Sequence, residues 1–222
     1  MGTITRSFAN NIGTSGILKA GAFNNASLNN VTALNAAIAT GNMVLISSQT
    51  ASNSASISFT TGIDSTYKEY QFWFINLYPK SNSVFQFNLS TDSGSNYNVT
   101  KTTTFFRAYH NQDDSASGLL YETGSDLAQS TAYQSLTNST ITSEATDNVT
   151  GYLQLFNPAS TTYVKHFIST TVSPYTGGST GSNYVINAFV AGYGNTTSAI
   201  NAVRFQMTGV NMDGTILMYG IK

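Results

Sequence analysis

The strongest hydrophobic pattern in the chain predicts a strand over residues 69–79. From Phe72 to Ile75 every side chain is apolar, so both faces of such a strand would need to be covered. This favours a place at the centre of a sheet. Trp73 is the single tryptophan and shares its parity with Ile75 and Leu77, and we therefore expect it in the core.

A second strand is expected over residues 83–90, after a turn that opens with a proline. There Phe85, Phe87 and Leu89 alternate with polar residues, a pattern typical of a strand with one buried and one solvated face. We interpret residues 69–90 as one antiparallel hairpin at the centre of the fold.

Further strands, separated by turn-forming residues, are expected along the rest of the chain. They cover residues 43–49, 54–60, 97–110, 151–156, 162–172, 183–193, 199–208 and 214–221. The last of them is apolar and is expected in the sheet interior, where it would remove an open edge. Many short strands without α/β alternation predict an all-β fold, an antiparallel β-sandwich of the jelly-roll kind.

Two segments lack a strand pattern and are expected to be loops. Residues 111–148 are the least regular, with a possible helical turn at 125–129 and a polar surface loop at 139–148. Residues 173–182 contain a proline and two glycine clusters. Tyr175 and Tyr184, in or beside this second loop, are candidates for surface contacts.

The first 41 residues differ from the rest. Residues 30–39 predict one short helix, capped by an asparagine and stopped by Gly41. Residues 1–30 have no strand or helix period, yet carry seven spaced apolar residues. This segment packs along its own domain, forms a frayed tail, or acts as an arm that binds a neighbouring subunit through Ile4, Phe8, Ile12, Ile17, Leu18, Phe23 and Leu28. We divide the chain into an arm with a helix, 1–41, and a β-sandwich domain, 42–222.

Composition favours an assembly over a free enzyme. Only 9% of residues are charged, against roughly 25% in ordinary soluble domains, so little charge repulsion separates neighbouring copies. A net charge of −1 without a basic run argues against nucleic-acid binding. The chain has no cysteine, which excludes disulfides and thiol catalysis. We expect no signal peptide and no membrane contact, because neither pattern is present.

No constellation of residues predicts catalysis, a cofactor or a metal. His110 with Asp113 and Asp114 is the best cluster, but it also fits a strand that ends in a polar turn, which we favour. His166 shares a strand face with Val164 and Ile168 and is expected to be half-buried and hydrogen-bonded. No spaced pair of carboxylates typical of a glycosidase stands out.

Several short segments of the sequence resemble a known protein family, although they contain no catalytic or ligand-binding motif. They lie at residues 1–11, 49–67, 96–104, 126–132, 164–167 and 189–193. On these residues the chain resembles virion proteins of marine tailed bacteriophages, of the cyanophage and pelagiphage kind, over nearly its whole length. The resemblance implies a non-enzymatic structural protein of the particle.

Two functional hypotheses follow. The first is a capsid decoration or head-accessory protein in the virion, a homotrimer that binds the major capsid protein through its arm and stabilises the shell. The alternative is a tail-fibre or receptor-binding module, in which the loops at 111–148 and 173–182 touch host surface glycans. A hydrolase without a recognisable motif is a third, weaker hypothesis.

Overall fold

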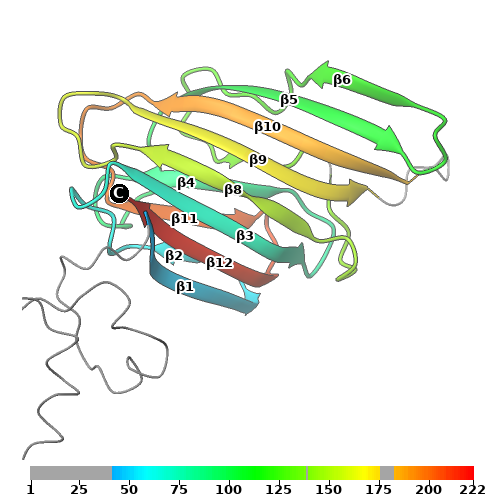
Figure 1. Cartoon of the computed structure of the whole chain (residues 1–222), viewed down its shortest axis with the longest axis horizontal. Coiled ribbons are helices and arrows are strands. Elements are labelled where there is room, and N and C mark those ends of the chain that lie inside the picture. Colours follow the sequence, from blue (N-terminus) through cyan, green and yellow to red (C-terminus); the bar gives the residue numbers. More distant parts are fainter. Residues whose placement is uncertain (1–41, 139, 176–182) are drawn as a thin grey trace, which may run out of the picture. The chain divides into compact units, whose positions relative to one another are not determined.

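The computed structural model describes residues 42–138, 140–175 and 183–222 (Figure 1). They lie in one compact unit, residues 41–222, and form twelve strands. The helix expected at 30–39 and the seven apolar residues of the arm lie outside the described residues, and so does most of the loop at 173–182.

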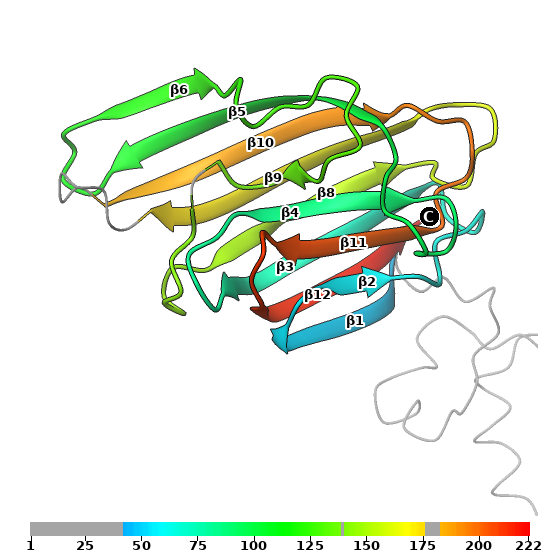
Figure 2. The same cartoon turned by 180° about the vertical axis from the view of Figure 1, so that it is seen from behind.

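The strands form two antiparallel sheets, which confirms the all-β sandwich. The large sheet has the order β1 (Met43–Ser54), β12 (Met212–Ile221), β3 (Glu69–Pro79), β8 (Val149–Phe156), β9 (Lys165–Tyr175), β10 (Tyr184–Gly194), β5 (Lys101–Asn111) and β6 (Ser117–Tyr121). The small sheet has the order β2 (Ile57–Phe59), β11 (Ala202–Met207), β4 (Phe85–Ser90) and β7 (Gln134–Ser135). Figure 1 looks onto the outer face of the large sheet, and Figure 2 shows the small sheet in front.

Eight of the strands have jelly-roll connectivity. The chain crosses from one sheet to the other between β1 and β2, β3 and β4, β7 and β8, and β11 and β12, so that β1-β12-β3-β8 packs on β2-β11-β4-β7. The four remaining strands, β9, β10, β5 and β6, are additions that widen the large sheet on its β8 side. The last strand, β12, lies between β1 and β3, as its apolar sequence predicts.

Aromatic side chains fill the space between the sheets. Phe74 meets Phe85 edge-on with ring centroids 5.0 Å apart, and Phe72 lies 5.3 Å from Phe205. All four rings are fully buried. Each such side chain removes roughly 150–250 Å² from water, so these four rings together bury roughly 600–1,000 Å².

The hairpin expected at 69–90 is wrong, because β3 and β4 lie in opposite sheets. The solvated face expected for β4 is also wrong at Asn88, which is buried. Its side-chain amide donates to the carbonyl of Tyr97 at 2.6 Å and to that of Thr131 at 3.0 Å. Loop segments therefore cover the polar side of β4.

The segment expected to be a loop at 111–148 contains β6 and β7, and no helical turn forms at 125–129. Residues of this segment bond to the added strands. Thr103 N donates to Leu127 O at 2.9 Å, and Thr171 Oγ1 donates to Leu136 O at 2.5 Å. The backbone and side chains of this segment cover the inner face of the large sheet beyond the end of the small sheet.

Candidate docking surface

The outer face of the large sheet carries Trp73, which the sequence placed in the core. The structure corrects that expectation, because Trp73 is 40% exposed and Ile75 is 38% exposed. The inner positions of the same strand are taken by Phe72 and Phe74, which are fully buried. Strand parity therefore leaves Trp73 and Ile75 on the outside.

A bulge explains why Leu77 is buried although it is two residues from Ile75. The pairing of β3 with both neighbours shifts beside Asn76, which has a φ of 51°. Asparagine tolerates this left-handed conformation better than most residues. On the partner strand, Gly214 has a φ of 120°, and a Cβ there would lie 2.6 Å from the carbonyl oxygen of Asn76. The extra residue reverses the parity of the strand and turns Leu77 inward.

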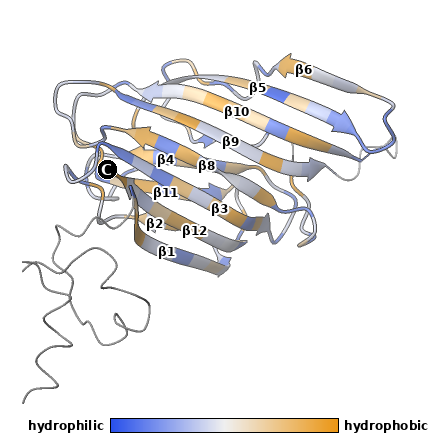
Figure 3. Cartoon of the chain, viewed as in Figure 1, coloured by the Kyte–Doolittle hydropathy of each residue, from blue (hydrophilic) through white to orange (hydrophobic). Residues whose placement is uncertain are grey.

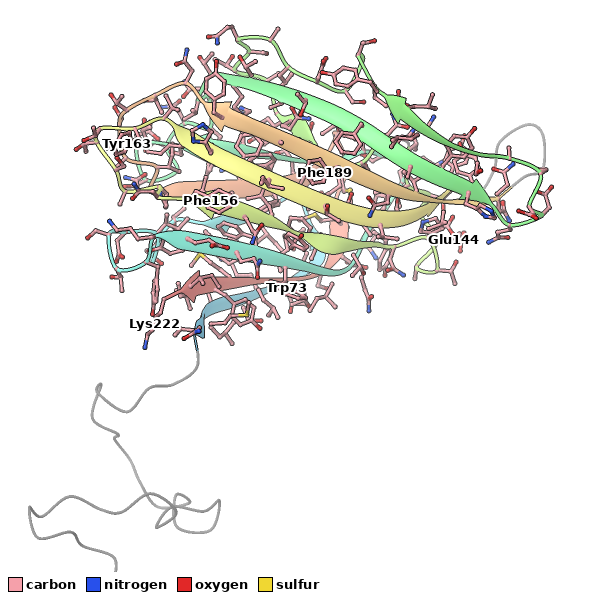
Figure 4. The ribbon with its side chains drawn as sticks, turned by 45° about the horizontal axis from the view of Figure 1, so that its top comes forward. Trp73, Glu144, Phe156, Tyr163, Phe189 and Lys222 are labelled. Atoms are coloured by element: carbon pink, nitrogen blue, oxygen red, sulfur yellow. The ribbon has the colours of Figure 1, made fainter. Side chains whose placement is uncertain are left out.

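A row of aromatic side chains crosses the outer face. In the pairing register each residue of the following series lies opposite the next one, on the neighbouring strand: Trp73, Tyr152, Thr170, Phe189, Phe106 and Tyr121. We call Trp73, Tyr152, Phe189, Phe106 and Tyr121 the aromatic row. Phe106 and Phe189 stack with centroids 4.8 Å apart, and Trp73 lies 6.2 Å from Tyr152. Figure 4 labels Trp73 and Phe189, and Figure 3 shows hydrophobic residues along β10 and at the end of β6.

The same face is nearly free of charge. The eight strands contain five charged side chains: Glu69, Lys101, Arg107, Lys165 and Asp213. The two lysines are buried, and Arg107 has the opposite parity to Phe106 and pairs with Glu122 at 2.5 Å. Glu69 and Asp213 remain, one at each end of the face. Both are hydrogen-bonded, the first to Gln154 at 2.9 Å and the second to Tyr78 at 2.7 Å.

Beside the aromatic row the face is hollowed. A shallow depression of about 420 Å³ is lined by residues that include Thr102, Thr104, Phe156, His166, Ala191 and Tyr193. Ala191 is small and lies on β10 between Phe189 and Tyr193, opposite Thr104 of β5. His166 lies on the same face as Ile168, as its parity predicts, but it is exposed and not half-buried.

The other sequence candidates are spread over the fold. His110 Nε2 lies 3.1 Å from an Asp114 carboxylate oxygen at the exposed end of β5, and Asp113 accepts hydrogen bonds from Ser115 in the following turn. The described ranges hold no cluster of three or more His, Asp or Glu side chains that could bind a metal ion. Tyr175 and Tyr184 pair across β9 and β10 and stack on one another at 4.7 Å.

Lys101 is the most unusual titratable group of the described chain, and the sequence reasoning missed it. Its side chain is fully buried and donates to Asn88 Oδ1 at 2.5 Å and to Val99 O at 2.9 Å. Burial lowers the pKa of this amine to about 7. The sequence feature that could have revealed its burial is its parity, which it shares with Thr103 and Phe105 on the inner face of β5. Because the amine is sealed from solvent, it serves the packing of the loops around β4.

Comparison of the chain with protein-family models, curated proteins and solved structures found no match. Within the described ranges, no helix has the length and apolar character needed to cross a membrane.

Proposed function

We propose that this chain is a non-enzymatic structural protein of a phage particle, most simply a capsid decoration protein, that works by associating with copies of itself and with the shell. The observation that carries the proposal is the aromatic row on an outer sheet face almost without charge. Isolated apolar residues are common on protein surfaces, but a contiguous apolar patch is characteristic of an interaction surface.

The outer face is large enough for a specific interface. Seven strand spacings of about 4.8 Å and strands of about ten residues at about 3.3 Å each give an outline of roughly 1,100 Å². A stable interface of standard size covers about 800 Å² on each partner. The two partners together would bury about 1,600 Å², of which roughly 57% is apolar in a typical interface. At about 25 cal/mol per Å² of apolar area this contributes about 23 kcal/mol gross, and association costs of about 4–15 kcal/mol oppose it.

The low charge of the chain supports the same proposal. Charged groups must lose their hydration on association, whereas aromatic side chains, and Thr or Gln side chains that keep a hydrogen-bond partner, are covered at a smaller cost. The virion location rests on the family resemblance, and the trimer and the major capsid protein as a partner are further parts of the proposal. The arm would supply a second contact with the shell.

The test compares the mass of the full chain with that of a double variant, Phe106→Glu with Phe189→Glu, by sedimentation equilibrium. We expect an oligomer for the unchanged protein and a monomer for the variant, with similar melting temperatures, because both rings lie on the outer face. Tyr163→Glu is the matched control, since Tyr163 is 67% exposed on a loop outside the sheets. A monomer for the unchanged protein at every concentration contradicts the proposal.

The depression favours a second candidate function, the binding of a neutral host glycan as part of a tail fibre. Phe156, His166 and Tyr193 offer ring surfaces, and the hydroxyl of Thr102, another lining residue, accepts a hydrogen bond from Gln129 Nε2 at 2.9 Å. A small-ligand site typically combines apolar walls with a few polar groups in this way. A glycan array that finds a ligand, with binding lost in Tyr193→Ala, would support the fibre. Copy number in the particle separates the two functions, because a decoration protein scales with the major capsid protein.

A further inference from the structure

Strand β6 forms one edge of the large sheet and is apolar on both faces. Figures 1 and 2 both show it at the margin of the sheet. Leu119 is 70% exposed, Leu120 44% and Tyr121 52%. Edge strands of soluble proteins usually carry a charge, a proline or a bulge that prevents pairing, and the sequence Ser-Gly-Leu-Leu-Tyr of β6 has none of these.

The backbone of β6 presents an open row of hydrogen-bonding groups. Asn111 N donates to Ala116 O and Glu122 N donates to Phe105 O, both at 2.9 Å. In an antiparallel ladder bonded and non-bonded pairs alternate, so Gly118 and Leu120 also bond to β5. The N–H and C=O groups of residues 117, 119 and 121 therefore point away from the sheet. Because β6 ends the strand order, these groups face no further strand of the described chain.

The opposite edge of the same sheet is different. The pairing of β1 with β12 has two irregularities, one between Leu45 and Ser47 and one between Ala51 and Ser54. Bulges of this kind twist an edge away from a flat partner. The pairing of β6 with β5 runs through five residues without a shift. Of the two edges, β6 is the one that can accept a further strand.

We propose that β6 pairs antiparallel with β6 of a second copy about a two-fold axis at Leu119, which joins the two large sheets into one. The inference rests on the proposed self-association and specifies its geometry. Leu119 would lie opposite the partner's Leu119, and Ser117 opposite the partner's Tyr121. Among two-fold registers that pair outward-pointing groups with one another, this is the one that uses residues 117, 119 and 121 together.

The side chains of β6 are self-complementary in this register. On the outer face two leucines meet at the axis, and Tyr121 carries the aromatic row to the boundary between the copies. On the inner face, Leu120 would lie opposite the partner's Gly118. A Cβ at Gly118 would be 2.8 Å from the ring of Tyr109, so this ring lies against the glycine and offers an apolar surface to Leu120. The strand carries no charge, so no like charges oppose one another.

The size of the contact sets its role. A five-residue edge of about 17 Å and a sheet thickness of about 10 Å give roughly 170 Å² per copy, well below the standard interface. The edge contact is therefore an addition to the outer face, continuous with it through the aromatic row. A two-fold contact of this kind would link oligomers into a layer.

The absence of cysteine from the chain allows a direct test. A directly opposed hydrogen-bonded pair has a Cα separation of about 5.5 Å, within the range of a disulfide. Under mild oxidation we expect Leu119→Cys to form a covalent dimer. Ser117→Cys alone should not, whereas a mixture of Ser117→Cys and Tyr121→Cys should. Tyr163→Cys, exposed but outside the sheets, measures random collision.

The inference is overturned if Leu119→Cys forms no more dimer than Tyr163→Cys, or if Ser117→Cys links to itself more readily. It is also overturned if dimer appears only after residues 1–41 are removed, since the arm would then be the natural occupant of the edge. An unchanged protein that remains oligomeric while these cross-links fail leaves the proposed function intact. Leu119→Lys tests the same contact without oxidation. It should dissociate the edge contact and lower the mass measured by sedimentation equilibrium, whereas Tyr163→Lys should leave that mass unchanged.

Discussion

The buried amine of Lys101 predicts a specific dependence of stability on pH. Its native pKa is about 7, whereas an unfolded lysine has a pKa of about 10.4. Between these two values the unfolded chain binds a proton that the native chain does not. The free energy of unfolding therefore rises with pH, at up to about 1.4 kcal/mol per pH unit.

From about pH 7 to about pH 9 this amounts to about 2 kcal/mol of added stability. Lys101→Met keeps an unbranched buried chain and removes the titration, so its stability should lack this rise. The assay is urea unfolding of both proteins at the two pH values, with the difference between their slopes as the result. Other groups titrate equally in both proteins, so their contributions cancel in the difference between the two slopes. Equal slopes would refute the assignment of a neutral, buried amine to Lys101.

Three further predictions test backbone conformation, core packing and electrostatics. Gly214→Ala should lower the free energy of unfolding by more than about 2 kcal/mol, because the new Cβ meets backbone, whereas Gly209→Ala, with a φ of 70° and open space around it, should cost only about 1 kcal/mol. Phe205→Ala removes a fully buried ring and should cost about 3–5 kcal/mol in the same assay. Asp213→Asn should lower the melting temperature at neutral pH, because the hydrogen bond and charge of Lys80 hold the pKa of this carboxyl at about 2. Its stabilisation is present above the unfolded pKa, is lost as the pH falls through about 2, and the variant and parent should then converge.

The strand pattern could be predicted because period-two alternation is local. Residues 97–110 and 214–221 were expected as strands, and β5 and β12 occupy most of these ranges. The hairpin at 69–90 failed because alternation shows which side chains share a face and does not show which sheet the strand joins. A jelly roll sends consecutive strands to opposite sheets, so β3 and β4 separate there.

The candidate surface could be predicted only in part. Trp73 lies in a run that is apolar at both parities, so the sequence alone does not choose its face. The bulge at Asn76 separates it from Leu77, and a single asparagine within a strand is a weak signal for it. The aromatic row depends on the register of segments as distant as Trp73 and Phe189, which local pattern does not contain. Low charge predicts an assembly in general and does not locate a surface for it.

The most direct test of the outer face uses its own tryptophan. Trp73 is the sole tryptophan of the chain and lies in the aromatic row, so its fluorescence reports on that surface alone. We predict that, as protein concentration rises through the monomer-to-oligomer transition seen by sedimentation, its emission shifts to the blue and acrylamide quenches it less. Quenching that stays constant while the mass increases, or a mass that never increases, would contradict association through this face.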